Sequence, residues 1–363
     1  MSSVIEHPVK QVVRRMYGLA LALRAMLAGD PGGSGLKVWY GGARAAKLGG
    51  PALKLGKLAE RFPEDRSRFT LAYLLSNMPY LPESALSALK RRGVPIVLNQ
   101  NGVFYPAWYG GDWQGRNRAM AAAYHAADHV LWQSDFCRRA ADRFLGERAG
   151  PGEVLANAVD IDRFRPQPVR PVGRFRFLLT GRIDAHQSYR LEQAVRGLAA
   201  ARAQGLEAEL LVAGVFDPSA KAKAMAAAGE LKIGGAVRFR GAYGPEDAPA
   251  LVRDAEAYVT LTHQDACPTG VIEALACGLP VVHVGTGGVP ELVGDAGAAV
   301  PSAEDWETQR IPEAAAVGAA MLAVAERRAE MSALARARAE ERFSLAKWLD
   351  HHEALFKRLL EGR

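Results

Sequence analysis

Short apolar runs separated by longer amphipathic segments recur along almost the whole chain, and this alternation limits the folds open to it. Runs such as 69–75, 95–99 and 129–133 suit buried strands, and each is followed by a segment with the length and polarity of a helix. Strands joined through helices run parallel, because antiparallel neighbours need only a tight hairpin. The sequence therefore predicts α/β domains in which parallel sheets carry helices on both faces.

The same alternation starts again in the second half of the chain, which indicates two domains. A chain of 363 residues suits two domains of roughly 150 to 180 residues better than one core. The periodicity lapses over 157–174, where prolines stiffen the path, and a new series begins with a predicted strand at 175–180. We expect a first domain at 1–168, a second at 169–343, and a last helix at 344–363 that packs back toward the first domain.

Composition and charge narrow the class of protein. Hydrophobic residues make up 49% and charged residues 23% of the chain, which excludes a disordered chain, a collagen-like fibre and a coiled coil. A net charge of +7 is compatible with an anionic ligand, an acidic membrane surface or nucleic acid. Nucleic acid is the weakest of the three, because the basic residues are dispersed and no recognised binding module is present.

Cysteine usage and hydropathy point to a compartment. Cys137, Cys267 and Cys277 form neither a disulfide framework nor a C-x-x-C metal pair, so we expect a reducing cytoplasm. No run of about 18 uncharged apolar residues predicts a spanning helix, and the N-terminal residues lack the order of features of a signal peptide. We expect a cytoplasmic protein, with peripheral contact at the inner face of the membrane left open.

The chain begins with a predicted helix that has a basic side. Lys10, Arg14, Arg15 and Arg24 lie among apolar residues, and a glycine-rich turn at 29–35 ends the segment. One interpretation is a helix packed on the edge of the first domain. The other is a helix that lies on an anionic membrane.

The strongest functional signal is a pair of acids on either side of a predicted helix start. Asp265 lies in the loop after a predicted strand, the helix begins near Thr269, and Glu273 follows one turn inside it. The first turn of a helix carries unpaired backbone N–H groups that favour phosphate. Carboxylates accept hydrogen bonds from hydroxyls, so the two acids can hold a polyhydroxylated ligand at separate points. Taken alone, such acids can also be a structural helix cap.

This segment, with its continuation ALACGLPVV, resembles the acid-x7-acid motif of glycosyltransferase family 4. Members of that family are retaining enzymes of the GT-B architecture, in which two Rossmann-like, doubly wound domains face a cleft. The resemblance implies that Asp265 contacts the donor sugar and that Glu273 binds the ribose. It also implies that the backbone amides of Thr269, Gly270 and Val271 hold sugar or phosphate. Asp265 stands where most of the family has Glu, which shortens the reach of the carboxylate.

Other segments resemble the same family in the same order along the chain. The similarity is clear from about residue 125 to 350 and thinner before that. Each match is short, but the shared order makes the set specific. The matching segments are 127–130, 133–137, 157–160, 164–166, 287–291 and 342–344.

Two positions depart from the family pattern. Arg182 matches the arginine that neutralises the donor diphosphate, but Gln187 stands where the family has a lysine. Glutamine carries no charge, so part of the leaving-group stabilisation is lost; Arg190 is either a substitute cation or a surface residue. In the first domain, Asn101 replaces the histidine of a His-Gly step that touches the donor sugar. Asn101 can hydrogen-bond a sugar hydroxyl, or it is simply a turn residue.

Further candidates come from glycines and aromatic residues. By resemblance, Gly49 and Gly50 let the backbone approach phosphate, although turn geometry alone explains them too. No G-x-G-x-x-G fingerprint of a dinucleotide dehydrogenase is present. Tyr243 follows a predicted strand near the place of the nucleotide base and is a candidate for stacking on it. Several aromatic residues form either an acceptor shelf or ordinary core: Tyr80, Tyr105, Trp108, Tyr109 and Trp113.

The resemblance implies a retaining glycosyltransferase that moves a hexose-type sugar from a UDP- or GDP-sugar to a glycan, lipid-linked or small-molecule acceptor, for example in polysaccharide biosynthesis. Catalysis then rests on positioning the donor and stabilising the departing diphosphate. We expect no metal or other cofactor, because Arg182 and the helix N-terminus supply positive potential. Gln187 and Asn101 suggest one alternative, a GT-B binding or scaffold subunit without turnover; a nucleotide-sugar epimerase is another.

Overall fold

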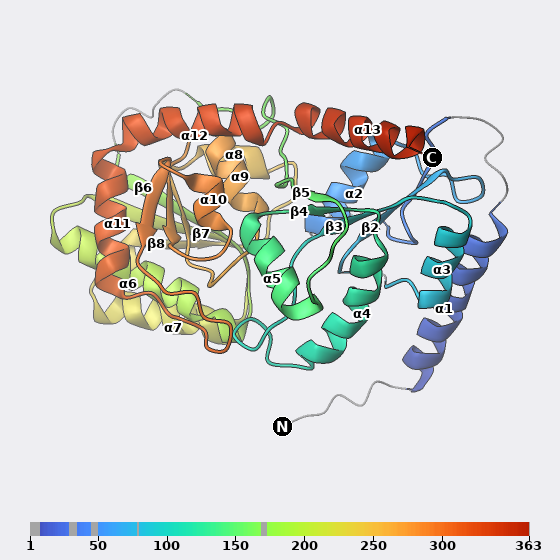
Figure 1. Cartoon of the computed structure of the whole chain (residues 1–363). Coiled ribbons are helices and arrows are strands. Elements are labelled where there is room, and N and C mark those ends of the chain that lie inside the picture. Colours follow the sequence, from blue (N-terminus) through green and yellow to red (C-terminus); the bar gives the residue numbers. More distant parts are fainter. Residues whose placement is uncertain (1–7, 29–34, 45–49, 78–79, 168–172, 363) are drawn as a thin grey trace.

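The computed structural model describes residues 8–28, 35–44, 50–77, 80–167 and 173–362 (Figure 1). Within these residues the chain forms two parallel sheets flanked by helices, which confirms the predicted α/β class. Gly49 and most of the glycine-rich turn at 29–35 lie outside the described residues. So does the expected domain boundary after residue 168, which stays a prediction.

The first sheet contains five described strands in chain order. Its first four strands are buried, because helices cover both faces, whereas the edge strand β5 is largely exposed. Alternate residues point to opposite sides, so Leu74, Leu98 and Val130 line one face in register. Tyr73 and Val97 line the other. The strands are β1 Val38–Trp39, β2 Leu71–Leu75, β3 Ile96–Gln100, β4 His129–Trp132 and β5 Gly152–Val154.

Different helices cover the two faces of this sheet. Helices α3 Glu83–Arg91, α4 Trp113–Ala126 and α5 Asp135–Leu145 pack on the face of Leu98. Helix α2 Gly50–Arg61 packs on the opposite face. There it is joined by the last helix, α13 Leu345–Glu361, which lies beside α2 in Figure 1 and buries Trp348, Leu355 and Phe356 against the first sheet.

The first described helix, α1 Pro8–Leu27, lies on the edge of the first domain. Its residues Leu21, Ala22 and Ala25 are buried against the core beside α3. This is the arrangement of the first of the two interpretations given for the N-terminal segment.

The second sheet has six described strands in the order β11-β10-β9-β6-β7-β8, so the strand order reverses between β6 and β9. This reversal is the mark of a doubly wound sheet, and ligands of such sheets bind beyond the carboxyl ends of the strands at that point. The strands are β6 Phe175–Ile183, β7 Ala208–Phe216, β8 Val237–Arg240, β9 Ala257–Thr260, β10 Val281–Val284 and β11 Gly297–Val300.

Helices also cover both faces of the second sheet. One set packs on the face that includes Leu179 and Val212: α6 Tyr189–Ala203, α7 Pro218–Glu230 and α11 Ala314–Glu326. The other set packs on the face of Leu178 and Tyr258: α8 Ala248–Arg253, α9 Thr269–Ala276, α10 Val289–Val293 and α12 Arg328–Arg342.

The sequence pattern of 311–342 predicts a single helix, which is wrong, because the segment divides into α11 and α12 at Arg327. The prediction also missed β5, α7, α8, α10 and β11. Helix α7 was not predicted because its buried side consists of alanines, which differ little in hydrophobicity from the residues on its exposed side. These alanines are Ala220, Ala224, Ala227 and Ala228.

No helix in the described ranges is both long enough and apolar enough to cross a bilayer.

Candidate functional site

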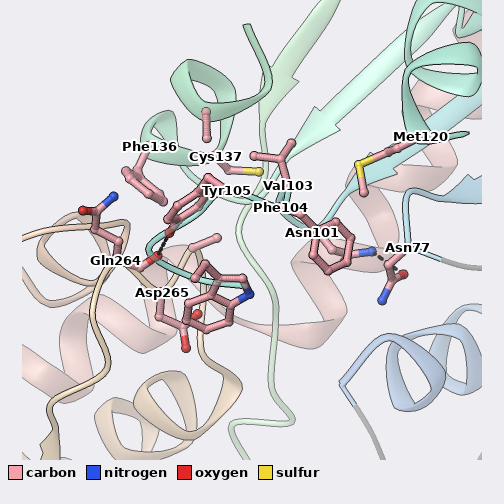
Figure 2. Close-up of a pocket in the computed structure, with 14 residues that line it drawn as sticks. Asn77, Asn101, Val103, Phe104, Tyr105, Met120, Phe136, Cys137, Gln264 and Asp265 are labelled. Atoms are coloured by element: carbon pink, nitrogen blue, oxygen red, sulfur yellow. Dashed lines mark hydrogen bonds between the residues drawn. The ribbon is translucent and has the colours of Figure 1, made fainter. Parts of the chain in front are cut away.

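Loops at the carboxyl ends of the two sheets meet and enclose a cavity of about 190 Å³ (Figure 2). The loop after β3 supplies Asn101 and Trp108, and the loop after β9 supplies Gln264 and Asp265. Tyr105 crosses between them and donates its hydroxyl proton to the backbone oxygen of Gln264 at 3.2 Å. Pockets that enclose a drug-sized ligand measure about 300–1,000 Å³, so this cavity encloses only part of a larger ligand.

Asp265 lies on the cavity wall, and its loop is held by close backbone packing. Its Oδ1 accepts a hydrogen bond from the Cys267 N–H at 3.2 Å, and its carbonyl accepts one from Gly288 at 2.8 Å. Burial raises the pKa of Asp265, while the charge of Arg190 opposes that rise. A Cβ on Gly288 would lie 2.0 Å from the Ala266 carbonyl oxygen. The glycine is therefore required for this loop to approach so closely.

Helix α9 begins beside Asp265 with open backbone donors. Its N-cap, Pro268, supplies no side-chain hydrogen bond. The Val271 N–H donates to the Pro268 carbonyl at 3.1 Å, and the Val271 side chain is buried in the core. The Val271 amide is therefore not available to a ligand. Within the described residues the amides of Thr269 and Gly270 remain as donors for a ligand. A Cβ on Gly270 would lie 2.6 Å from the Tyr258 hydroxyl, so only glycine fits there.

Glu273, one turn into α9, faces basic residues from the first domain and the linking segment. Burial raises its pKa to about 7, while the charges of Lys57 and Arg163 oppose the rise. Lys57 comes from α2, and its Nζ donates to the Ala158 carbonyl at 3.3 Å. The charge of Glu273 contributes to a raised pKa of Tyr243, after the larger effect of burial. The two predicted ligand contacts, Glu273 and Tyr243, therefore lie in one region.

Three polar residues near the carboxyl end of β6 differ sharply in exposure: Arg182, Gln187 and Arg190. Arg182 is exposed at the end of the strand and forms no ion pair within the described part of the chain. Gln187 lies in a short 3₁₀ turn, Ala185–Gln187, and its Oε1 accepts a hydrogen bond from Arg190 Nη1 at 3.5 Å.

Arg190 is only 8% exposed, so its interpretation as a surface residue is wrong. Its Nη2 would lie 3.7 Å from a Cβ on Gly181, which places the guanidinium at the carboxyl end of β6. The Arg190 Nε is buried without a hydrogen-bond partner. A buried cation with a free donor beside Asp265 is suited to an anionic ligand.

Asn101 is held by four hydrogen bonds around its backbone and side chain. Its N–H donates to Ser76 Oγ at 2.9 Å, and its Nδ2 donates to Asn77 Oδ1 at 3.1 Å. Its Oδ1 accepts from Lys54 Nζ at 2.8 Å and from Gln133 Nε2. Asn101 is therefore more than a turn residue, since its side chain is fixed at the cavity wall.

Lys54 is the residue that sequence reasoning missed in this network. It lies on α2, is 8% exposed, and donates to Asn99 Oδ1 at 2.7 Å as well as to Asn101. Burial lowers the pKa of Lys54 to about 7. The sequence feature that could have indicated it is a lysine among apolar residues in the first turns of the predicted helix that follows the candidate glycines. Gly50 is the first residue of that helix.

The predicted aromatic shelf does not form as a unit. Of its members, Tyr105 and Trp108 line the cavity, and Tyr105 is almost wholly buried. Tyr109 instead packs edge-on to Phe104, 5.2 Å between ring centroids, and Trp113 packs on Phe144 at 5.7 Å. Most of these rings therefore belong to the packing of the first domain, which agrees with the alternative interpretation of them as ordinary core residues.

Two contacts unforeseen in the sequence join the domains around the cavity. Glu291 of α10 accepts hydrogen bonds from the N–H groups of Asp135 and Phe136, at 2.6 and 2.8 Å, and so caps α5. Trp306, in the loop after β11, stacks on Phe136 with 5.1 Å between centroids and packs edge-on to Tyr105 at 5.0 Å. These contacts hold the two walls of the cavity together.

Among the described residues, no group of three His, Cys, Asp or Glu side chains is arranged to hold a metal ion. The expectation of a metal-independent site remains a prediction.

Comparisons with known proteins agree with this architecture. Residues 174–330 match the family model of group 1 glycosyl transferases. A search of curated protein sequences found no match. Among solved structures, HepE of Anabaena in complex with UDP has a TM-score of 0.68 at 16% identity, over 89% of this chain and 100% of that chain.

Two further structures show the same likeness. HepE in complex with UDP-glucose gives a TM-score of 0.65 at 17% identity, over 88% of this chain and 99% of that one. Sucrose-phosphate synthase from Thermosynechococcus elongatus gives a TM-score of 0.63 at 17% identity, over 86% of this chain and 79% of that one. At these identities the likeness shows the fold, and the expected GT-B architecture is confirmed. This chain therefore has the GT-B architecture, and residues 174–330 of its second domain match the model of the group 1 glycosyl transferases.

Proposed function

We propose that this protein transfers a hexose-type sugar from a nucleotide-diphosphate sugar to a hydroxyl acceptor, with retention of configuration at the anomeric carbon. The observation that carries the proposal is the arrangement around α9. Asp265 lies at the cavity, Glu273 lies one turn inside the helix, and the open amides of Thr269 and Gly270 lie between them. Such a site offers hydrogen-bond acceptors for sugar and ribose hydroxyls and donors for the diphosphate between them.

The structural neighbours support this class of donor. HepE was solved with UDP and with UDP-glucose, and the pneumococcal O-GlcNAc transferase GtfA was solved with UDP and GlcNAc. We therefore favour a UDP-sugar over a GDP-sugar, with glucose or a related hexose as the first sugar to test.

In the proposed mode of binding, each part of the donor has its own contacts. Glu273 accepts hydrogen bonds from the ribose hydroxyls, and Tyr243 packs on the base. The diphosphate faces the start of α9 together with Arg182 and Arg190. Arg190 supplies the positive charge that Gln187 cannot, because its buried guanidinium has an unpaired donor beside Asp265. The sugar then lies in the cavity between Asp265 and Asn101.

The proposed reaction needs no protein nucleophile. The bond between the anomeric carbon and the diphosphate oxygen breaks, and the acceptor hydroxyl forms its bond on the same face. The hydroxyl proton passes to the departing phosphate oxygen. The protein contributes positive charge at the leaving group and fixed polar groups around the sugar, which act most strongly in a site that excludes water. The contacts of Glu291 and Trp306 between the domains favour such a closed site.

The test begins with binding and ends with chemistry. A panel of UDP- and GDP-sugars is screened for thermal stabilisation of the purified protein, because a ligand that binds the folded state raises its apparent stability. The stabilising donor is then incubated with sugar and lipid-linked acceptors, and the anomeric configuration of the product is determined by NMR. Transfer with retention supports the proposal. Donor binding without transfer or hydrolysis supports the scaffold alternative, and inversion refutes the mechanism.

We also propose that α1 makes peripheral contact with an anionic membrane. Met16, Leu19, Leu23 and Leu27 recur on one side of the helix and are 54–77% exposed, while the opposite side is packed against α3. Arg24 is exposed near this stripe, and the helix contains no acidic residue. Apolar side chains flanked by basic ones are typical of helices that lie in a lipid interface. A lipid-linked acceptor at the cytoplasmic face would then meet the enzyme at its own surface.

Sedimentation with vesicles tests this contact. The protein should co-sediment with vesicles that contain phosphatidylglycerol and much less with phosphatidylcholine alone, and added salt should weaken binding. The double variant Leu19→Gln, Leu23→Gln should lose binding while keeping its melting temperature, because both side chains are exposed. If it binds as well as the wild type, or if light scattering shows that the stripe instead pairs two copies, the membrane proposal is wrong.

A further inference from the structure

The amide of Asn101 has only one orientation available, and Lys54 is a main cause. An Asn side chain can place either its oxygen or its NH2 group toward a neighbour, and the choice follows from the neighbours' donors. Lys54 and Gln133 both approach the same side of Asn101 through nitrogen atoms that donate. The Asn101 oxygen must therefore face them. Its NH2 group then faces Asn77 and the cavity (Figure 2).

This arrangement leaves one donor of Asn101 for a ligand. The oxygen has two lone pairs, and both are used by Lys54 and Gln133. The NH2 group has two hydrogens, of which one is donated to Asn77 Oδ1 at 3.1 Å. Within the described residues the second hydrogen has no partner. Because Asn101 lines the cavity, this hydrogen is placed to donate to a ligand oxygen there.

Lys54 is itself held from the side away from the cavity. Its Nζ donates to Asn99 Oδ1 at 2.7 Å, and Asn99 is 1% exposed. The Tyr73 hydroxyl lies near the Asn99 side chain and 3.2 Å from Nε2 of His352 on α13. A chain of buried polar groups thus runs from the last helix to the cavity wall, with Lys54 as its link to Asn101.

The charged and titratable groups around Lys54 do not alter this geometry. Lys57 on α2, Cys137 on α5, Cys267 before α9 and His352 on α13 face it. None of them is a carboxylate, and burial raises the pKa of both thiols to about 12, so they stay neutral. An ammonium has three N–H donors and a neutral amine still has two. Either form of Lys54 can donate to both asparagine oxygens.

We propose that Lys54 is a positioning residue, which fixes the Asn101 amide so that its free N–H points to the sugar in the cavity. The reaction that this serves is the transfer proposed above, but the orientation of Asn101 is a property of the protein alone. Lys54 acts through Asn101 and does not line the cavity itself.

The first test is structural and does not depend on activity. In a neutron crystal structure of Lys54→Met, which distinguishes the amide oxygen from the deuterated nitrogen, the Asn101 amide should rotate or become disordered, because the long apolar side chain fills a similar space but donates nothing. Lys57→Met is the matched control, since it removes a lysine one turn further along α2 that does not touch Asn101. The amide should keep its orientation in that variant. An unchanged Asn101 in Lys54→Met overturns the proposal, whether or not the wild type transfers sugar.

The second test is a double-mutant cycle on transfer. Lys54→Met should lower kcat by about tenfold to a hundredfold with little change in the donor Kd, because a displaced contact at the reacting sugar costs rate. Asn101→Ala should lower kcat similarly. If Lys54 acts through Asn101, the double variant is no slower than Asn101→Ala. Equal further losses in both backgrounds would show a purely structural role and refute the proposal. If Lys54→Met does not fold, Lys54→Gln replaces it in both tests, because its amide is a polar group that suits this buried site but its shorter, uncharged side chain reaches less far toward the two asparagine oxygens.

Discussion

The two walls of the cavity are built in different ways. The wall from the second domain comes from one continuous segment, in which Asp265, the start of α9 and Glu273 follow each other within one loop and one helix. The wall from the first domain is assembled from distant segments. Asn101 follows β3, Lys54 comes from α2, and Gln133 follows β4. One wall is thus fixed by local sequence and the other by tertiary contacts.

This difference shows where the two departures from the family pattern are accommodated. Elsewhere in the second domain, we propose that Arg190 takes the place of the missing lysine at Gln187, which lies three residues earlier in the chain. On the assembled wall, Asn101 stands where the family has a histidine, and a network that reaches α13 holds its side chain. The second kind of compensation involves more of the fold, so we expect changes there to affect rate and stability together.

The largest effect is expected at Asp265. Replacement by Ala should lower transfer by about a hundredfold to a thousandfold, which is the range for removing one polar group that stabilises a transition state. Within the described residues its side chain accepts from N–H groups of its own loop, such as that of Cys267, so the melting temperature should change little. Steady-state rates and thermal unfolding measure the two effects. If Asn101→Ala costs more rate than Asp265→Ala, the assembled wall is the dominant one and the comparison is reversed.

The next effect is expected at Arg190. Arg190→Gln removes the buried charge beside the expected diphosphate and should lower kcat by about a hundredfold. Exposed Arg182 should matter less in the same assay when changed to Gln, since water screens its charge. Adding Gln187→Lys to Arg190→Gln restores a cation at the family position and should recover part of the rate. No recovery, together with an equal loss in Arg182→Gln, would show that Arg190 does not replace the missing lysine.

A smaller effect of about tenfold is expected from the pH dependence of donor binding. Burial raises the pKa of Glu273 to about 7. Only the carboxylate form accepts hydrogen bonds at both oxygens, so UDP should bind best above pH 7 and lose affinity as pH falls through 7. Between pH 8 and pH 6 the ionised fraction of such a group drops roughly tenfold. Calorimetric titration of UDP should show this slope in the wild type and a flat profile in Glu273→Gln. A flat wild-type profile contradicts the ribose assignment.

The same comparison explains what could be predicted from the sequence. Strands such as β3 and β4 and the start of α9 at Thr269 follow from local apolar runs and punctuation, and they were placed correctly. The sequence did not predict that Arg182 is exposed and Arg190 is buried, because both are arginines near the end of the same strand and nothing local distinguishes them. Lys54 and Trp306 were missed because their partners lie far away in the sequence. Local order predicts the continuous wall, whereas the assembled wall depends on which segments the fold brings together.

The smallest effect is expected at Tyr243, on the outer part of the donor site. Its ring is half-buried near Glu273, and its hydroxyl lies near the Thr180 side chain. If the ring stacks on the nucleotide base, Tyr243→Leu should weaken UDP binding roughly threefold to tenfold, because this change in Kd corresponds to the free energy of one aromatic pair. Tyr243→Phe keeps the ring, loses only the hydroxyl, and should bind UDP about as well as the wild type. Calorimetry on both variants separates the two contributions. Equal weakening in both would assign the effect to the hydroxyl, and the stacking assignment of Tyr243 would then be wrong.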